Sequence, residues 1–291
     1  MSELSKYTDE QLLAELDSRR QKAMNKKGFV RCKDCVKPGK CNLFKSLKEG
    51  VYRKCEDYKT KKYFTEELLK DTIENGIDLR CVSTMQGRSI TDQNKFIEEF
   101  VDTHSDRFIA VASINPKEDD AMEEVYRVAR SGKYKAIEFD SLEHGYIPEI
   151  APNIDDIFNV CEQYGLVVNC FTGWGDHTAP MQWAYYAKRH PNVPMVMLHM
   201  GGYDFGYNCV QVAKKFENVF VETSDVYELQ IMHIALREIP HEKILFGSQF
   251  PDKITRCSMD FFDMFDISEE DREKFFYKNA AKLLKLDVFN D

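Results

Sequence analysis

The chain has 291 residues, a formal net charge of −9 and 43% hydrophobic residues. A β/α barrel takes about 250 residues, so this length predicts one barrel domain and an additional segment. No stretch reaches the roughly 18 apolar residues of a membrane span, and the start MSELSKYTDEQLLAELDSRR has the pattern of a charged helix rather than a secretory leader. These features exclude a membrane-spanning protein, and we expect a cytoplasmic one.

Charge is divided unevenly along the chain. Residues 1–62 hold 17 Lys and Arg against 9 Asp and Glu, which leaves a strongly negative remainder. We therefore expect a basic N-terminal segment, residues 1–62, packed on an acidic barrel, residues 63–291. The basic segment either docks on its own barrel or binds an anionic ligand. Nucleic acid is the least favoured partner because the segment lacks the interleaved aromatic residues of known binding motifs, and a homo-oligomer stays open.

Four cysteines stand in that basic segment, at Cys32, Cys35, Cys41 and Cys55. Cytosolic thiols stay reduced, so a metal centre explains the spacing C-x2-C-x5-C-x13-C better than disulfides do. Neighbouring Lys and Arg residues favour the thiolate that metals require, and a metal would stabilise a segment poor in apolar residues. We predict a structural zinc ion, with a 4Fe-4S cluster as the alternative and four unrelated cysteines as the third interpretation.

Seven short apolar runs follow one another along the rest of the chain, each succeeded by a helical pattern. This alternation is typical of a parallel α/β fold, here a (β/α)8 TIM barrel. The runs are Leu79 to Thr84, Phe108 to Ile114, Tyr134 to Phe139, Leu166 to Phe171, Met195 to His199, Val219 to Thr223 and Lys243 to Gly247.

In such a barrel, functional side chains lie at the C-terminal ends of the strands. Those ends are polar in this chain and carry Met85, Asn115, Glu138 with Asp140, Cys170 to Gly173, His199 with Gly201 and Gly202, Glu222 with Ser224, and Ser248 with Gln249.

Several blocks carry a family resemblance. They are DRFIAVASINP at 106–116, PMVMLHMGG at 194–202, NVFVETS at 218–224 and KILFGSQFP at 243–251. From Tyr63 onward the chain resembles the amidohydrolase-related barrel family, which includes metal-dependent decarboxylases and hydrolases of small carboxylic acids. The resemblance implies a TIM barrel, a metal that polarises substrate or water, and His199 as a metal ligand or acid/base.

The family's usual metal ligands are not kept. Members carry an H-x-H pair on the first strand, a His on the fifth and an Asp on the eighth, whereas this sequence has no H-x-H. Phe171 and Gln249 stand where the fifth-strand His and the eighth-strand Asp would fall. A neutral amide is a poor substitute for a carboxylate in charge and basicity, so a metal in the barrel is doubtful.

A metal centre at a different position could replace the family's missing metal ligands. Lys27 to Cys32 is the apolar run nearest to the place of the missing first strand. If it fills that place, Cys32 and Cys35 emerge where the H-x-H pair would stand. Otherwise the cysteines form a plug or lid.

We expect a working pocket at the barrel mouth, with His199 and Glu138 as catalytic residues. Its remaining members are polar or aromatic residues near the strand ends, namely Trp174, Asp176, His177, Gln249 and Cys170. The sequence thus predicts metal-assisted hydrolysis or decarboxylation of a small carboxylated or aromatic substrate. The alternative is a noncatalytic barrel whose zinc or iron–sulfur module serves binding, sensing or partner docking.

Overall fold

The computed structural model describes residues 8, 10, 11, 13–15, 60–83 and 89–287. The chain divides into two compact units, Met1–Asp78 and Leu79–Asp291. In the first unit, helix α3 spans Thr60–Glu74. Within α3, Leu68 and Leu69 are buried, and the Thr72 hydroxyl donates to the Leu68 carbonyl at 2.7 Å. The four N-terminal cysteines and the candidate strand at 27–32 lie outside the described residues.

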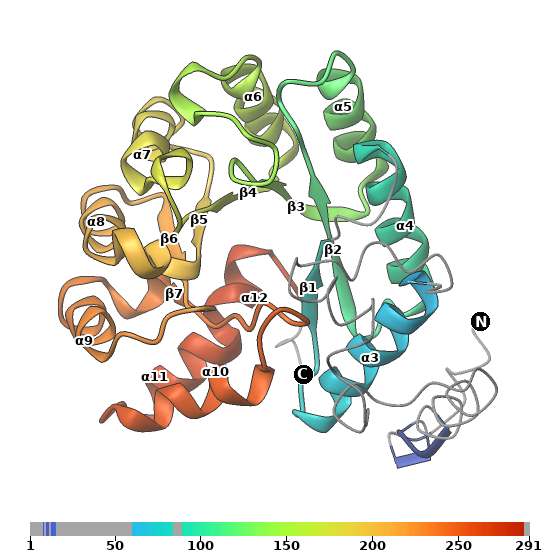
Figure 1. The fold of residues 1–291 in the computed structure, drawn as a ribbon, viewed down its shortest axis with the longest axis vertical. Coiled ribbons are helices and arrows are strands. Elements are labelled where there is room, and N and C mark those ends of the chain that lie inside the picture. The colour runs from blue at the N-terminus through green and yellow to red at the C-terminus, as the bar shows by residue number, and fades with distance from the viewer. Residues whose placement is uncertain (1–7, 9, 12, 16–59, 84–88, 288–291) are drawn as a thin grey trace, which may run out of the picture. The chain divides into compact units, whose positions relative to one another are not determined.

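In the second unit, the described residues form a sheet of seven parallel strands in chain order, β1 to β7. Their bounds are β1 Arg80–Val82, β2 Phe108–Ser113, β3 Tyr134–Phe139, β4 Val167–Phe171, β5 Met195–Leu198, β6 Val219–Glu222 and β7 Ile244–Leu245. Each coincides with a predicted run, with small differences at the ends. The sheet curls, and helices lie on its outer side (Figure 1). The predicted α/β barrel-type fold is thereby confirmed for these seven strands and their helices.

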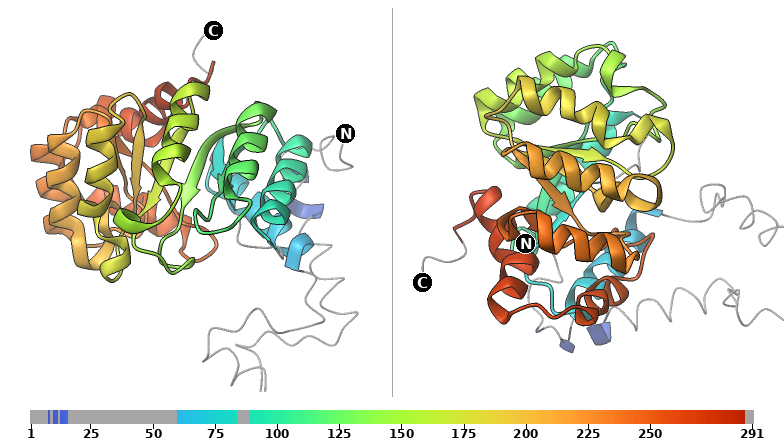
Figure 2. Two further views of the ribbon diagram at one scale, coloured as in Figure 1. Left: turned by 90° about the horizontal axis from the view of Figure 1, so that it is seen from above. Right: turned by 90° about the vertical axis from the view of Figure 1, so that its left-hand side faces the viewer.

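Helices connect the strands, and Figure 2 shows them as a layer outside the sheet. They are α4 Ile90–Thr103, α5 Ala121–Ser131, α6 Ile154–Tyr164, α7 Pro180–Arg189, α8 Gly202–Lys215, α9 Leu229–Glu238, α10 Thr255–Phe261, α11 Glu269–Glu273 and α12 Asn279–Leu283. Ser89 caps α4 by accepting the Asp92 N–H, and α5 and α6 end at left-handed glycines, Gly132 and Gly165. No helix in the described part of the chain is both long and apolar enough to cross a membrane.

The inner face of the curled sheet has an apolar base. Its buried cluster joins residues of five strands to helix α12 and comprises Val111, Ala136, Val167, Val196, Leu245 and Leu284. Successive side chains of a strand point to opposite faces, so residues two positions further along share this inner face. Glu138 follows Ala136 on β3, Asn169 and Phe171 follow Val167 on β4, and these positions lie nearer the C-terminal strand ends. The inner face therefore changes from apolar to polar toward the expected site.

Candidate active site

Glu138 is the first ionisable side chain on the inner face. It stands one residue before the end of β3, and the Ser83 hydroxyl donates to its Oε2 at 3.2 Å. Burial, followed by the charges of Asp140 and Glu222, raises the pKa of Glu138 to about 7. A carboxyl group with this pKa exists in both protonation states near neutral pH. It can therefore give up a proton that an ordinary exposed glutamate would already have lost.

Glu222, the last residue of β6, holds the turn after β5 in place. Its Oε2 accepts the backbone N–H of His199 at 3.0 Å, and its Oε1 accepts the backbone N–H of Ser224 at 2.9 Å. A Cβ added at Gly247 would lie 1.2 Å from Glu222 Oε1, so only glycine leaves room for this carboxylate. Burial raises the pKa of Glu222, against the hydrogen bonds donated by His199 and Ser224.

His199 lies directly after β5 and is 4% exposed. Its Nδ1 lies 2.7 Å from the Ser224 hydroxyl oxygen. Phe171 packs edge-on against its ring at 4.7 Å between centroids, and Trp174 lies at 5.7 Å. Burial, and secondarily the charge of Lys253, lowers the pKa of His199 to about 4. His199 is therefore neutral at physiological pH and available as a proton acceptor.

Unusual backbone geometry is concentrated in the same place. Left-handed φ angles occur at His199 (64°), Met200 (41°), Asp225 (62°) and Gln249 (47°), each just after a strand end. A residue other than glycine adopts this conformation at an energetic cost, and such residues cluster at functional sites. The backbones of Gly173 and Gly202 also meet closely, because a Cβ on Gly202 would lie 2.9 Å from the Gly173 Cα. The loop after β4 is thus in close backbone contact with the start of α8.

A lysine lies beside this histidine. Lys253 Nζ is 2.7 Å from Oδ1 of Asp225, whose side chain is 2% exposed while that of Lys253 is 33% exposed. The ammonium also lies about 6 Å from the ring centres of Trp174 and Tyr227, within cation–π range. One donor of the ammonium serves Asp225, so further donors stay available to an anion reaching the mouth.

The predicted site residues do not all lie beside His199. Trp174 joins His199 and Lys253, whereas Asp176 and His177 lie exposed on the short helix η4, Asp176–Thr178. His177 contacts the Tyr146 carbonyl at 3.3 Å. Gln249 is partly buried, and its Oε1 has no hydrogen-bond partner within the described residues.

Cys170 is set apart from the predicted site. It is fully buried on the face of β4 opposite to Phe171, and burial raises the pKa of its thiol well above the ordinary value.

Sequence reasoning noticed Glu222 and Ser224 at a strand end without assigning them a role, and it missed Asp225, Gly247 and Lys253. The alternation along β6 was the available signal for Glu222, since it lies two residues after Phe220 and shares its inner face. Lys253 lies in a loop after Pro251, where no periodic pattern applies. Its pairing with Asp225 depends on how two loops fold back, which spacing alone does not reveal.

The described residues do not fit the metal centre that the family resemblance implies. No three His, Cys, Asp or Glu side chains in the described ranges are arranged to share a metal ion. Phe171, at a predicted ligand position, instead packs its ring on His199, and Gln249 offers one neutral amide oxygen. A centre of the usual kind would need donors beyond these residues.

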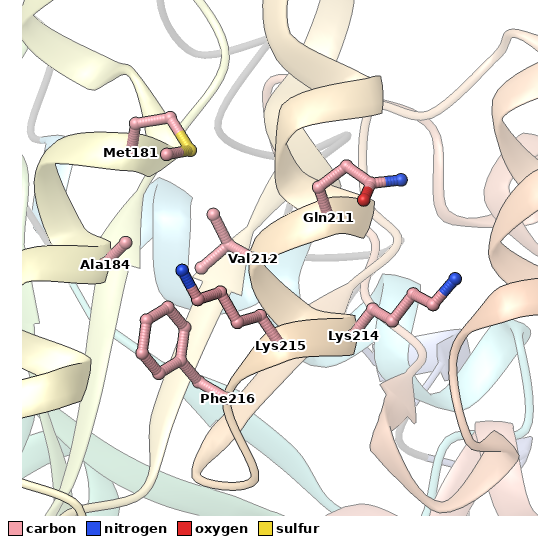
Figure 3. Close-up of a pocket in the computed structure, with 7 residues that line it drawn as sticks. All are labelled: Met181, Ala184, Gln211, Val212, Lys214, Lys215 and Phe216. Carbon is pink, nitrogen blue, oxygen red and sulfur yellow. The ribbon is translucent and has the colours of Figure 1, made fainter.

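A separate groove of about 440 Å³ lies on the outer helices (Figure 3). It is lined by residues of α7, α8 and the turn after α8, namely Met181, Ala184, Gln211, Val212, Lys214, Lys215 and Phe216. Lys214 pairs with Glu238 at 3.3 Å. None of the predicted site residues lines this groove, so it is distinct from the strand-end site.

Comparison with known proteins gives a family match over most of the barrel. The family model described as amidohydrolase matches residues 82–286. A curated relative, gamma-resorcylate decarboxylase of Rhodococcus jostii (strain RHA1), is 38% identical over 71 residues, which are 24% of this chain and 22% of the relative. The matched region thus spans less than a quarter of that relative.

Solved structures share the fold at low sequence identity. A 5-carboxyvanillate decarboxylase from Sphingomonas paucimobilis aligns with a TM-score of 0.62 and 17% identity, covering 75% of this chain and 82% of that one. A second 5-carboxyvanillate decarboxylase, from Novosphingobium aromaticivorans DSM 12444, aligns with a TM-score of 0.60 and 18% identity over 76% and 80% of the chains. The latter is complexed with manganese and 4-hydroxy-3-methoxy-5-nitrobenzoic acid. These likenesses establish the barrel architecture.

Proposed function

Because the chain belongs to the amidohydrolase family, a family of enzymes, we propose that it catalyses nonoxidative decarboxylation of a small hydroxylated aromatic acid. The observation that carries this proposal is a neutral, aromatic-flanked His199 in a site that also contains a carboxyl group, Glu138, with a pKa of about 7. The decarboxylases among the similar proteins support the reaction type and the substrate class. Hydrolysis of a related carboxylic acid is the second candidate.

Each part of the site has a role in this reaction. The aromatic faces of Phe171 and Trp174 suit a planar ring. The available donors of Lys253 attract the substrate carboxylate toward the mouth. His199 accepts a hydrogen bond from a ring hydroxyl, which raises electron density on the ring carbon that bears the carboxylate.

Proton transfer then comes from Glu138. Its neutral form gives a proton to the ring carbon, the bond from that carbon to the carboxylate breaks, and carbon dioxide leaves. The bond's electron pair stays with the ring, and water returns a proton to Glu138. The products are carbon dioxide and the phenol.

Metal chemistry enters this proposal only through the family. The manganese in one similar decarboxylase supports a metal cofactor, which would polarise the substrate carboxylate. The described side chains do not form its shell, so no step above depends on it.

The test is conversion of gamma-resorcylate to resorcinol, followed by chromatography and by release of carbon dioxide, with and without added Mn²⁺. We expect His199→Ala and Glu138→Gln each to lower kcat by about 100-fold or more, the usual contribution of a positioned acid or base. Lys214→Met, in the outer groove, serves as the matched control and should keep full activity. If the wild type releases no carbon dioxide from gamma-resorcylate or 5-carboxyvanillate under either condition, decarboxylation is wrong.

We also propose that Cys32, Cys35, Cys41 and Cys55 bind a metal, as zinc or as a 4Fe-4S cluster. Elemental analysis of anaerobically purified protein distinguishes zinc from iron with acid-labile sulfide. Cys35→Ser and Cys41→Ser should each release the metal, whereas Cys257→Ser, an exposed cysteine of the other unit, should not. Full retention in both variants would contradict this assignment.

A further inference from the structure

The side chain and the backbone of His199 are both held by one neighbouring strand end. The Ser224 hydroxyl lies 2.7 Å from His199 Nδ1 and donates to Glu222 Oε2, also at 2.7 Å. The same Oε2 accepts the His199 backbone N–H. We propose that Ser224 and Glu222 are positioning residues that hold His199 as the tautomer protonated on Nδ1, leaving Nε2 unprotonated toward the substrate. This inference rests on the proposed function only for what Nε2 does.

The direction of the hydrogen bonds follows from counting protons. The Ser224 hydroxyl has a single proton and two close partners, an imidazole nitrogen and a carboxylate oxygen. An ionised carboxylate can only accept, so the hydroxyl proton points to Glu222. The Ser224 oxygen must then accept from His199, which places the imidazole proton on Nδ1. A neutral imidazole has one ring proton, and Nε2 therefore keeps its lone pair.

The Glu222 carboxylate is the final acceptor in this series of hydrogen bonds and is held in place. Burial raises the pKa of Glu222, but two backbone N–H groups and one hydroxyl donate to its oxygens, and donors of this kind favour the ionised form. Its position against Gly247 leaves no space for a larger side chain there. The carboxylate therefore cannot rotate away without breaking several hydrogen bonds, and the order of donors and acceptors is preserved.

The arrangement also accounts for the left-handed turn at His199. Its φ of 64° is costly for a histidine, and the hydrogen bond from its N–H to Glu222 secures that conformation. One carboxylate thus fixes the backbone directly and the ring through Ser224. Losing either Ser224 or Glu222 should change the ring's protonation pattern before it changes the fold.

Nuclear magnetic resonance of protein labelled with ¹⁵N-histidine tests the tautomer directly. The His199 signals are identified by their loss in His199→Gln. At pH 7 we expect the wild type to show a protonated Nδ1 and an unprotonated Nε2. In Ser224→Ala the preference should be lost, and in Glu222→Gln it should reverse, because the amide can donate to Ser224 and turn the hydroxyl toward Nδ1.

Thr223→Ala is the matched control. Thr223 is the adjacent buried residue, and its hydroxyl has no hydrogen-bond partner within the described residues. This variant should keep the wild-type tautomer and turnover. Ser224→Ala and Glu222→Gln should lower kcat roughly 100-fold with a smaller change in KM, because a histidine protonated on Nε2 cannot accept the hydrogen bond of the ring hydroxyl.

The outcomes separate the two proposals. A wild type protonated on Nε2, or a Ser224→Ala variant with an unchanged tautomer, would overturn the positioning role. The expected tautomers together with no turnover of any aromatic acid would leave the positioning role standing and remove the proposed decarboxylation.

Discussion

In two polar clusters of the same barrel, the pKa values of glutamates are shifted in opposite directions. On the outer side, Glu124 of α5 is 5% exposed yet receives Arg127 Nε and Nη2, each at 2.8 Å, and Asn94 Nδ2 at 2.8 Å. Burial opposes ionisation there, but these donors lower the pKa of Glu124. At the strand ends, burial dominates and raises the pKa values of Glu138 and Glu222.

This difference separates a structural cluster from a functional one. A buried carboxylate matched by arginine stays ionised and ties α4 to α5, since Arg127 also reaches Glu98 of α4 at 2.9 Å. Glu138, which receives the neutral Ser83 hydroxyl, stays ready to exchange protons, whereas three donated hydrogen bonds favour Glu222 as an acceptor. The donors of Glu124 include the charged Arg127 guanidinium, whereas the printed donors of Glu138 and Glu222 are hydroxyls and backbone N–H groups, so the charge of the donors makes the distinction.

We expect the largest effect on stability and turnover from a substitution that displaces Glu222 by steric clash. Gly247→Ala places a methyl group 1.2 Å from the present position of Glu222 Oε1, which must move away from His199 and Ser224. We expect a loss of about 3 kcal/mol in the free energy of unfolding, by urea denaturation, and near-complete loss of turnover. Gly145→Ala is the control for losing a glycine without a steric clash, because a Cβ there would have nothing within 4 Å; Gly145 has a positive φ, whereas Gly247 does not. A loss in Gly145→Ala as large as that in Gly247→Ala would show that the clash with Glu222 does not explain the effect.

The second prediction concerns the structural cluster and removes the positive charge that pairs with its glutamates. Arg127→Met leaves Glu124 and Glu98 without their shared guanidinium. Removing one partner of a buried ion pair costs several kcal/mol, and the partial exposure of Arg127, 30% of its side chain, reduces this to about 2 kcal/mol. Turnover per folded molecule should stay at the wild-type level, in contrast to Gly247→Ala. A marked fall in kcat at full folding would mean that the outer cluster also serves the active site.

Much of this molecule could be predicted from the sequence, for identifiable reasons. The strands are buried on both faces, so continuous runs such as Met195 to Leu198 stand out from the helical patterns. The inward position of Glu138 follows from alternation along β3. On β4 the sequence placed Phe171 at the ligand position and added Cys170 to the pocket, although these adjacent residues lie on opposite faces. Val167, Val168, Cys170 and Phe171 are all buried, so their pattern does not distinguish the inner face from the outer.

The missing information is three-dimensional. His199, Ser224 and Glu222 meet only because residues after β5 turn left-handed, which no propensity predicts for histidine. The role of Gly247 is equally hidden, since a glycine after an apolar run usually indicates only a turn. The contacts of these residues, rather than their identities, define the candidate site.

The last prediction compares how the free energy of unfolding depends on pH in variants of the two clusters. The raised pKa of Glu138, about 7 against an ordinary value of 4.5, means that its contribution to stability is fully present below pH 4.5 and is lost as pH rises through 7. Glu138→Gln should therefore match the wild type at pH 4 and be more stable than it at pH 8, by at most about 3 kcal/mol. Glu124 has a lowered pKa, so its contribution is present above pH 4.5 and is lost as pH falls through the folded-state value. Glu124→Gln should consequently be less stable than the wild type at pH 8 and approach it in acid. Urea denaturation across pH 3 to 8 measures both differences, and slopes of the same sign would show that the two clusters do not differ in the way their donors indicate.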